Sequence, residues 1–157
     1  MRLSKQNTDS VYTNISTVSF TGTRDGMTKK QLKSFKELLI EMKADLLVHG
    51  DCIGADDQAG NVAGSLGMSV NKRPSTLSDD RAFSKVGTVV AEERPPLDRN
   101  RDIVDDGDCL IACPRRMKEE RRSGTWATVR YAAKIDTPLW LVWPDGSVKS
   151  PVEPSRY

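Results

Sequence analysis

The fold is decided by residues 108–143, which read DCLIACP at 108–114 and SGTWATVRYAAKIDTPLWLVW at 123–143. The first segment holds a short apolar run, 109–113, that Pro114 stops, as is typical of a buried strand. A helical pattern then runs from Ser123 or Thr125 to Lys134, and a second apolar run occupies 138–143. Strand, helix and strand in this order predict a βαβ unit with parallel strands.

The same alternation extends toward the N-terminus. The runs 17–21 (TVSFT), 45–49 (DLLVH) and 68–72 (MSVNK) are predicted strands. Helices are predicted after Thr28, which can act as a cap, and at 55–66 and 97–106. The predicted fold class is therefore α/β, a Rossmann-like three-layer fold with a mostly parallel sheet of about five strands.

The chain of 157 residues has the usual length of one domain. We expect a single nucleotide-binding domain at 15–146, a flexible N-terminal segment at 1–14 and a C-terminal tail at 147–157. The segment 73–96 has proline near both ends and weak periodicity, apart from a helical turn expected near 79–83. Long connections in compact domains are usually functional or mobile, so this one is a candidate lid.

The charges are nearly balanced, with 24 basic and 22 acidic side chains and a net charge of +2. No strong global field attracts nucleic acid, so any anion site must be local. No stretch approaches the roughly 20 apolar residues of a membrane span, and 1–14 lacks a signal peptide's apolar region, so we expect a cytoplasmic protein. Cys52, Cys109 and Cys113 lack zinc-site spacing, and neither a metal nor a cofactor is expected.

The strongest candidate site is Ser123, Gly124 and Thr125, which follow a predicted strand and open a helix. Unpaired amides, two hydroxyls and the positive end of the helix dipole meet there, which favours a phosphate. Simple helix capping is the alternative. Trp126 beside this site could stack on a base, although core packing is the more common role of such a residue.

Other candidates follow the first two strands, because ligands of open parallel sheets bind beyond the carboxyl ends of the strands. The segment Gly22, Thr23 and Arg24 offers an accessible backbone, a hydroxyl and a guanidinium suited to phosphate, although an ordinary loop is the more common explanation of such a segment. After the second strand, two glycines bracket a tight turn that leads into acidic residues suited either to helix capping or to ribose hydroxyls. These residues are Gly50, Asp51, Gly54 and Asp56.

Arg99, Asn100 and Arg101 form a compact cationic group beside Asp98 and Asp102. This group favours either internal salt bridges or a bidentate contact with phosphate. The single histidine, His49, ends the second predicted strand, where a general base could act. A hydrogen-bonded structural role is the more common one for such a residue, and its role stays open.

Three segments together resemble the SLOG superfamily of Rossmann-like proteins, which includes the Lonely Guy phosphoribohydrolases and the DNA-processing protein DprA. They are GDCIGADDQAGNVAGSLGMSV (50–70), RNRDIVDDGDCLIACP (99–114) and SGTWATVRYAAKIDTPLWLV (123–142). The resemblance implies a nucleotide whose phosphate rests on residues 123–125, with Gly22, Thr23, Gly50 and Gly54 shaping the other walls. The phosphoribohydrolases carry a glutamate just after this loop, where the present chain has Trp126, Ala127, Thr128 and Val129.

The missing carboxylate weakens the case for hydrolysis, because an N-glycosidic bond breaks through a cationic state that a carboxylate stabilises. We therefore predict a module that binds a phosphate-bearing nucleotide or nucleotide-derived signal for sensing or sequestration, for example in phage counter-defence. One alternative is a nucleoside monophosphate N-glycosidase using Arg99 or Arg101 with Asp51, Asp56 or Asp102. Another is DprA-like single-stranded DNA binding. The resemblance also suggests a homo-oligomer, without a membrane partner.

Overall fold

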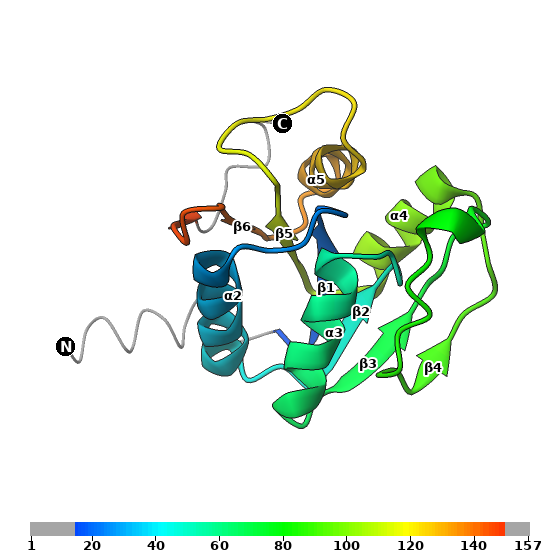
Figure 1. The fold of residues 1–157 in the computed structure, drawn as a ribbon, viewed down its shortest axis with the longest axis horizontal. Coiled ribbons are helices and arrows are strands. Elements are labelled where there is room, and N and C mark those ends of the chain that lie inside the picture. The colour runs from blue at the N-terminus through cyan, green and yellow to red at the C-terminus, as the bar shows by residue number, and fades with distance from the viewer. Residues whose placement is uncertain (1–14, 150–157) are drawn as a thin grey trace.

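The computed structural model describes residues 15–149, which form an α/β structure around a seven-stranded sheet (Figure 1). The strand order is β4-β3-β2-β1-β5-β6-β7, and all neighbouring strands are parallel except β6 and β7. The five predicted strands are all present, and the predicted fold class is confirmed. They are β1 (Thr17–Gly22), β2 (Leu46–His49), β3 (Ser69–Lys72), β5 (Cys109–Cys113) and β6 (Leu139–Val142).

Two short edge strands were not predicted. β4 (Val89–Val90) pairs with β3 inside the long connection, and β7 (Val148–Lys149) pairs antiparallel with β6. Each has two residues, which is too short for a period-2 pattern to stand out in the sequence. β7 also extends the folded part of the chain past residue 146, the predicted start of the tail. The remainder of that tail and the predicted flexible segment 1–14 lie outside the described residues.

Two pairs of helices cover opposite faces of the sheet, as the three-layer prediction requires (Figure 1). α2 (Lys29–Met42) and α3 (Ala55–Ser65) pack on a core that includes Phe20, Ile111 and Trp140. α4 (Pro96–Asp106) and α5 (Gly124–Lys134) pack on a second core that includes Leu110 and Leu141. Successive residues of β5 and β6 thus enter different cores, as the alternation of side chains along a strand dictates.

The connection between β3 and α4 is fastened to the end of β2. Asp51, which follows β2, accepts a hydrogen bond from the Ser84 amide at 2.9 Å and pairs with Arg81 at 3.0 Å. The Ala82 amide donates to the Asp51 carbonyl oxygen at 2.7 Å. A short 3-10 helix, η1 (Ser78–Asp80), stands where a helical turn was expected. The lid role of this segment stays a prediction. No helix among residues 15–149 is long and apolar enough to cross a membrane.

Candidate functional site

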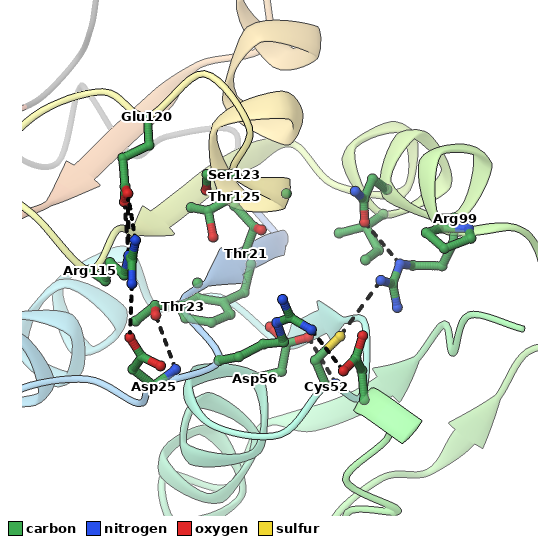
Figure 2. A pocket seen from close by; sticks show the side chains of 18 of the residues that line it. Thr21, Thr23, Asp25, Cys52, Asp56, Arg99, Arg115, Glu120, Ser123 and Thr125 are labelled. Atoms are coloured by element: carbon green, nitrogen blue, oxygen red, sulfur yellow. Dashed lines mark hydrogen bonds and ion pairs between the residues drawn. The ribbon is translucent and has the colours of Figure 1, made fainter. Parts of the chain in front are cut away.

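A pocket of about 470 Å³ opens beyond the carboxyl ends of β1 and β5 (Figure 2). β1 lies between β2 and β5 in the sheet, so the chain proceeds outward from β1 in both directions. Ligands of open α/β sheets bind at such a switch point. Figure 2 shows Ser123 and Thr125 at the start of α5, with Arg115 and Glu120 on one side of the pocket and Arg99 on the other.

The start of α5 combines capping with open donors. The Ser123 hydroxyl accepts a hydrogen bond from the Trp126 amide at 3.3 Å, so this side chain is the helix cap. The amides of Gly124 and Thr125 donate to no acceptor within residues 15–149. A Cβ added at Gly124 would meet no atom within 4 Å, so the space beside this residue is open. Two main-chain donors at the positive end of the helix therefore face the pocket.

The loop after β1 forms the floor of the pocket. Gly22 lies so close to α3 that an added Cβ would come within 2.6 Å of the Cβ of Ala55. Thr23 lines the pocket, and its hydroxyl accepts a hydrogen bond from the Asp25 amide at 3.1 Å. Arg24 also lines it and pairs with Asp80 of η1 at 2.7 Å. An anion in this part of the pocket would compete with Asp80 for the Arg24 guanidinium.

α4 supplies a buried positive charge. Arg99 is only 7% exposed, and its Nη1 donates to the carbonyl oxygens of Gly50 at 2.6 Å and Arg73 at 3.2 Å. It forms no ion pair with a carboxylate of the described residues, because Asp102, the expected partner, pairs with Arg94 at 2.7 Å. Asn100 also lines the pocket and accepts from the Arg99 Nε at 2.9 Å. Within residues 15–149 the Arg99 guanidinium therefore forms no ion pair, although its charge acts on the neighbouring Asp56 carboxyl and opposes the rise in the pKa of that group.

Asp56 brings a carboxylate to the same wall. One of its oxygens accepts hydrogen bonds from the amides of Gly50 and Cys52, each at 3.1 Å. Burial raises the pKa of this carboxyl, although His49 and these amides oppose the rise. Asp56 thus fastens the turn after β2 to α3 and also lines the pocket, but it does not cap α3, whose N-cap Gly54 has no side-chain cap hydrogen bond.

Two predicted glycines shape the site without lining it. Gly50 lies under Arg99, and an added Cβ would come within 2.6 Å of the Nη1 atom of this arginine. Gly54 has a φ of +87°, and an added Cβ would overlap the Arg24 carbonyl and lie 2.8 Å from the Thr23 carbonyl oxygen. The Ala55 amide donates to that same Thr23 oxygen at 2.9 Å. Gly54 therefore lets two loops of the site meet backbone to backbone.

Three further predicted residues lie outside the pocket lining. Asp51 is fully buried and holds the long connection instead of facing a ligand. Arg101 stacks over the ring of Tyr131, with 5.5 Å between the guanidinium carbon and the ring centroid. Trp126 is 1% exposed and packs against Trp143, so core packing and not base stacking is its role in this structure.

One segment of the site, the charged run 115–122, was not predicted. Arg115, Glu120 and Arg122 line the pocket. Arg115 pairs with Glu120 at 2.8 Å and with Asp25 at 3.6 Å (Figure 2). The available signal was position, because this run directly follows a strand of the parallel sheet. Other lining residues that were not predicted are Phe20, Thr21, Asp25, Cys52, Asp80, Pro96 and Ile103.

No carboxylate takes the place of the phosphoribohydrolase glutamate. Thr128 is 1% exposed, and its hydroxyl donates to the Gly124 carbonyl oxygen at 2.9 Å, inside the helix. Residues 15–149 contain no group of three or more His, Cys, Asp or Glu side chains that could hold a metal ion. The Cys52 thiol lines the pocket, but burial raises its pKa to about 11, so it is protonated at neutral pH.

His49 is a structural residue that makes the stability of the fold depend on pH. Its Nδ1 accepts a hydrogen bond from the Asp51 amide at 2.9 Å, and it is fully buried outside the pocket lining. Burial lowers its pKa below the ordinary histidine value of about 6.5, even though Asp56 and Asp51 raise it. The unfolded chain therefore binds a proton at a higher pH than the folded chain does, and stability falls as the pH drops below about 6.5.

We expect His49→Asn, which keeps an acceptor for the Asp51 amide, to remove this contribution. Urea unfolding at pH 7.5 and pH 5.5 measures it, and the native protein should lose about 1 kcal/mol more than the variant over this interval. The same pH dependence in both proteins would show that His49 is not the titrating group.

No protein-family model matches the chain, and no curated protein sequence is significantly similar to it. Solved structures do share its fold. The molybdenum cofactor binding protein from the phototrophic bacterium Rippkaea orientalis is 20% identical, with a TM-score of 0.63 over 82% of this chain and 76% of that chain. The Moco carrier protein from Chlamydomonas reinhardtii is 20% identical, with a TM-score of 0.59 over 80% of this chain and 75% of that chain.

DNA processing protein A from Helicobacter pylori, described with a single-stranded DNA binding mode, is also 20% identical. Its TM-score is 0.59, and the match covers 84% of this chain and 67% of that chain. At this level of identity the likenesses show the fold alone, and they confirm the predicted Rossmann-like fold. The molybdenum cofactor and single-stranded DNA are ligands of those similar proteins, and a shared fold does not assign them to this chain.

Proposed function

We propose that the pocket binds a nucleotide or nucleotide-derived signalling molecule, with a phosphate group at the start of α5. The observation that carries this proposal is that the unpaired amides of Gly124 and Thr125 open into the same pocket as the buried Arg99. A phosphate would accept hydrogen bonds from the two amides and supply negative charge to a cavity whose buried guanidinium forms no ion pair with a carboxylate of residues 15–149.

The pocket also suits the rest of such a ligand. Its volume of about 470 Å³ lies in the range of small-molecule sites. The hydroxyls of Thr21 and Thr23 can bond to a sugar, while Ile103 and Pro96 offer apolar contact to a base. Phosphate-bearing ligands that combine these parts include nucleoside monophosphates, ADP-ribose and cyclic dinucleotides. Capture without reaction would serve the sensing or sequestration of such a signal.

One observation favours a nucleoside monophosphate N-glycosidase as the second candidate. Asp56 is a buried carboxyl with a raised pKa, and it lines the pocket together with Arg99. Perturbed carboxyls in pockets are common among catalytic acids. Against this role, Asp56 already holds two backbone amides, and residues 126–129 contain no carboxylate in the stretch where the phosphoribohydrolases carry their glutamate. We therefore place capture first.

A ligand panel separates the two functions. The protein is incubated with inorganic phosphate, the four nucleoside 5′-monophosphates, ADP-ribose and cyclic dinucleotides, and each mixture is examined by thermal unfolding and by chromatography. Capture predicts stabilisation by about 3 kcal/mol at a ligand concentration near one hundred times the dissociation constant, with the ligand recovered intact. Release of free base would instead establish the N-glycosidase. A panel without any stabilisation or product would refute both.

A further inference from the structure

The loop 115–122, RRMKEERR, carries more positive charge than its own carboxylates neutralise. Glu120 pairs with Arg115 at 2.8 Å, and Glu119 pairs with Arg130 of α5 at 2.5 Å. The remaining four cations form no ion pair with a carboxylate of residues 15–149, and we call them the basic lip. They are Arg116, Lys118, Arg121 and Arg122.

The basic lip lies at the rim of the pocket. Its loop leaves β5 directly and leads into α5, and Arg122 itself lines the pocket. Both ends of the loop are fastened, because Gln31 donates to the Pro114 carbonyl oxygen at 2.9 Å and Arg130 donates to the Arg121 carbonyl oxygen at 3.0 Å. These anchors keep the cations next to the site.

The electrostatic field of the lip reaches the pocket wall. The pKa of Glu120 is lowered, first by its hydrogen bond from Arg115 and in smaller part by the charges of Arg115, Arg116 and Lys118. Glu120 lines the pocket. The exposed side chains of Arg116 and Lys118 therefore act on a group that would lie next to a bound ligand. An anion at the rim would experience the same attraction.

The loop 115–122 has an excess of positive charge. It carries five basic and two acidic side chains, a net charge of +3, whereas the whole chain has a net charge of +2. Like charges without a counter-ion repel one another, and such a cluster is neutralised when an anion binds. The phosphate proposed at α5 is bound by two amides and Arg99. It therefore does not neutralise the cations of the basic lip.

We infer that the ligand carries a second phosphate group, separated from the first, and that the basic lip binds it. This inference rests on the proposed function, because the first phosphate must anchor the ligand at α5. It narrows the ligand class from mononucleotides to bisphosphorylated nucleotides or short dinucleotides. The lip is limited to one loop, which suits a small ligand and not a long strand.

The test compares the four nucleoside 5′-monophosphates with the four matching 3′,5′-bisphosphates by calorimetry at several salt concentrations. The test variant is the triple substitution Arg116→Gln, Lys118→Gln and Arg121→Gln, which leaves the pocket-lining Arg122 in place. A charge-matched control carries Lys33→Gln, Lys36→Gln and Lys134→Gln, three exposed lysines on helices α2 and α5. A single-stranded DNA 12-mer without terminal phosphates completes the set of probes.

We expect the preferred bisphosphate to bind roughly tenfold more tightly than its monophosphate, the effect of one charge-assisted contact of ordinary strength. Its affinity should also fall more steeply with salt, by about 0.7 in the logarithmic slope. The triple lip variant should lose this advantage and keep the monophosphate affinity, whereas the control should keep both.

Four results would overturn the inference. Equal affinity for the two ligand series, while monophosphates still bind, would show that no second phosphate is bound and would leave the proposed function intact. A bisphosphate advantage that survives in the triple lip variant would assign the second phosphate to other residues. Binding of the DNA 12-mer as tightly as the bisphosphate would make the lip a nucleic-acid surface. Failure of both ligand series to bind would overturn this inference, and it would refute the proposed function as well only if ADP-ribose and the cyclic dinucleotides of the panel also fail.

Discussion

Gly124→Asp is expected to abolish nucleotide binding without weakening the fold. The added carboxylate would lie where no protein atom stands within 4 Å, beside the unpaired amides proposed to hold phosphate. A negative charge at the first residue of a helix stabilises the helix by about 0.3–1 kcal/mol, and replacing glycine at a φ outside the left-handed region restricts the unfolded chain. The same charge repels a phosphate, so affinity should fall roughly a hundredfold or more.

The opposite signs of the two effects make the test specific. Calorimetry with the best ligand of the panel measures affinity, and urea unfolding measures the free energy of unfolding. Gly124→Asn is the matched control, because its side chain has nearly the same shape but no charge, and the difference between the two variants isolates the electrostatic term. Equal affinities for the Asp and Asn variants would exclude a phosphate at the start of α5.

Gly54→Ala is expected to cause the largest loss of stability among single changes in the site. Its φ of +87° is unfavourable for alanine, and the new Cβ would overlap the backbone carbonyl of Arg24. Backbone atoms cannot rotate away as a side chain can, so the loop after β1 and the turn before α3 must separate. We expect a loss of about 3 kcal/mol or more in the free energy of unfolding, measured in urea.

Gly67→Ala supplies the control for conformation alone. Gly67 has a similar φ of +83°, but an added Cβ there would meet no atom within 4 Å. This variant should therefore lose only about 1 kcal/mol, the usual cost of a left-handed alanine. Similar losses in the two variants would show that the close approach of the two loops contributes little.

Local patterns were sufficient to predict the main elements of this protein. The apolar runs of the five long strands and the helical spacing after Thr28 predicted the layers, because burial of one face imposes a period on the sequence. Thr28 caps α2, with the Gln31 amide donating to its hydroxyl at 3.0 Å. The start of α5 was also predictable, because the end of a strand followed by a helix start places unpaired amides at the binding edge of any parallel sheet.

Tertiary structure alone decided which of the predicted residues face the pocket. Thr125 and Trp126 are neighbours in the sequence, yet Thr125 lines the pocket while Trp126 packs against Trp143. Arg99 could have paired with Asp102, but Arg94 takes that partner. The charges of the run 115–122 show no period, and its role at the pocket depends on residues distant in the chain, such as Gln31 and Asp25.

The sequence by itself therefore determined the strands, the helices and the edge of the sheet at which a ligand would bind. The structure determined which charges are neutralised by the protein and which remain for a ligand. The physical reason is the separation of the interacting residues along the sequence. Backbone periodicity and capping involve residues within about four positions of each other. Ion pairing and packing join residues that only the folded chain brings together.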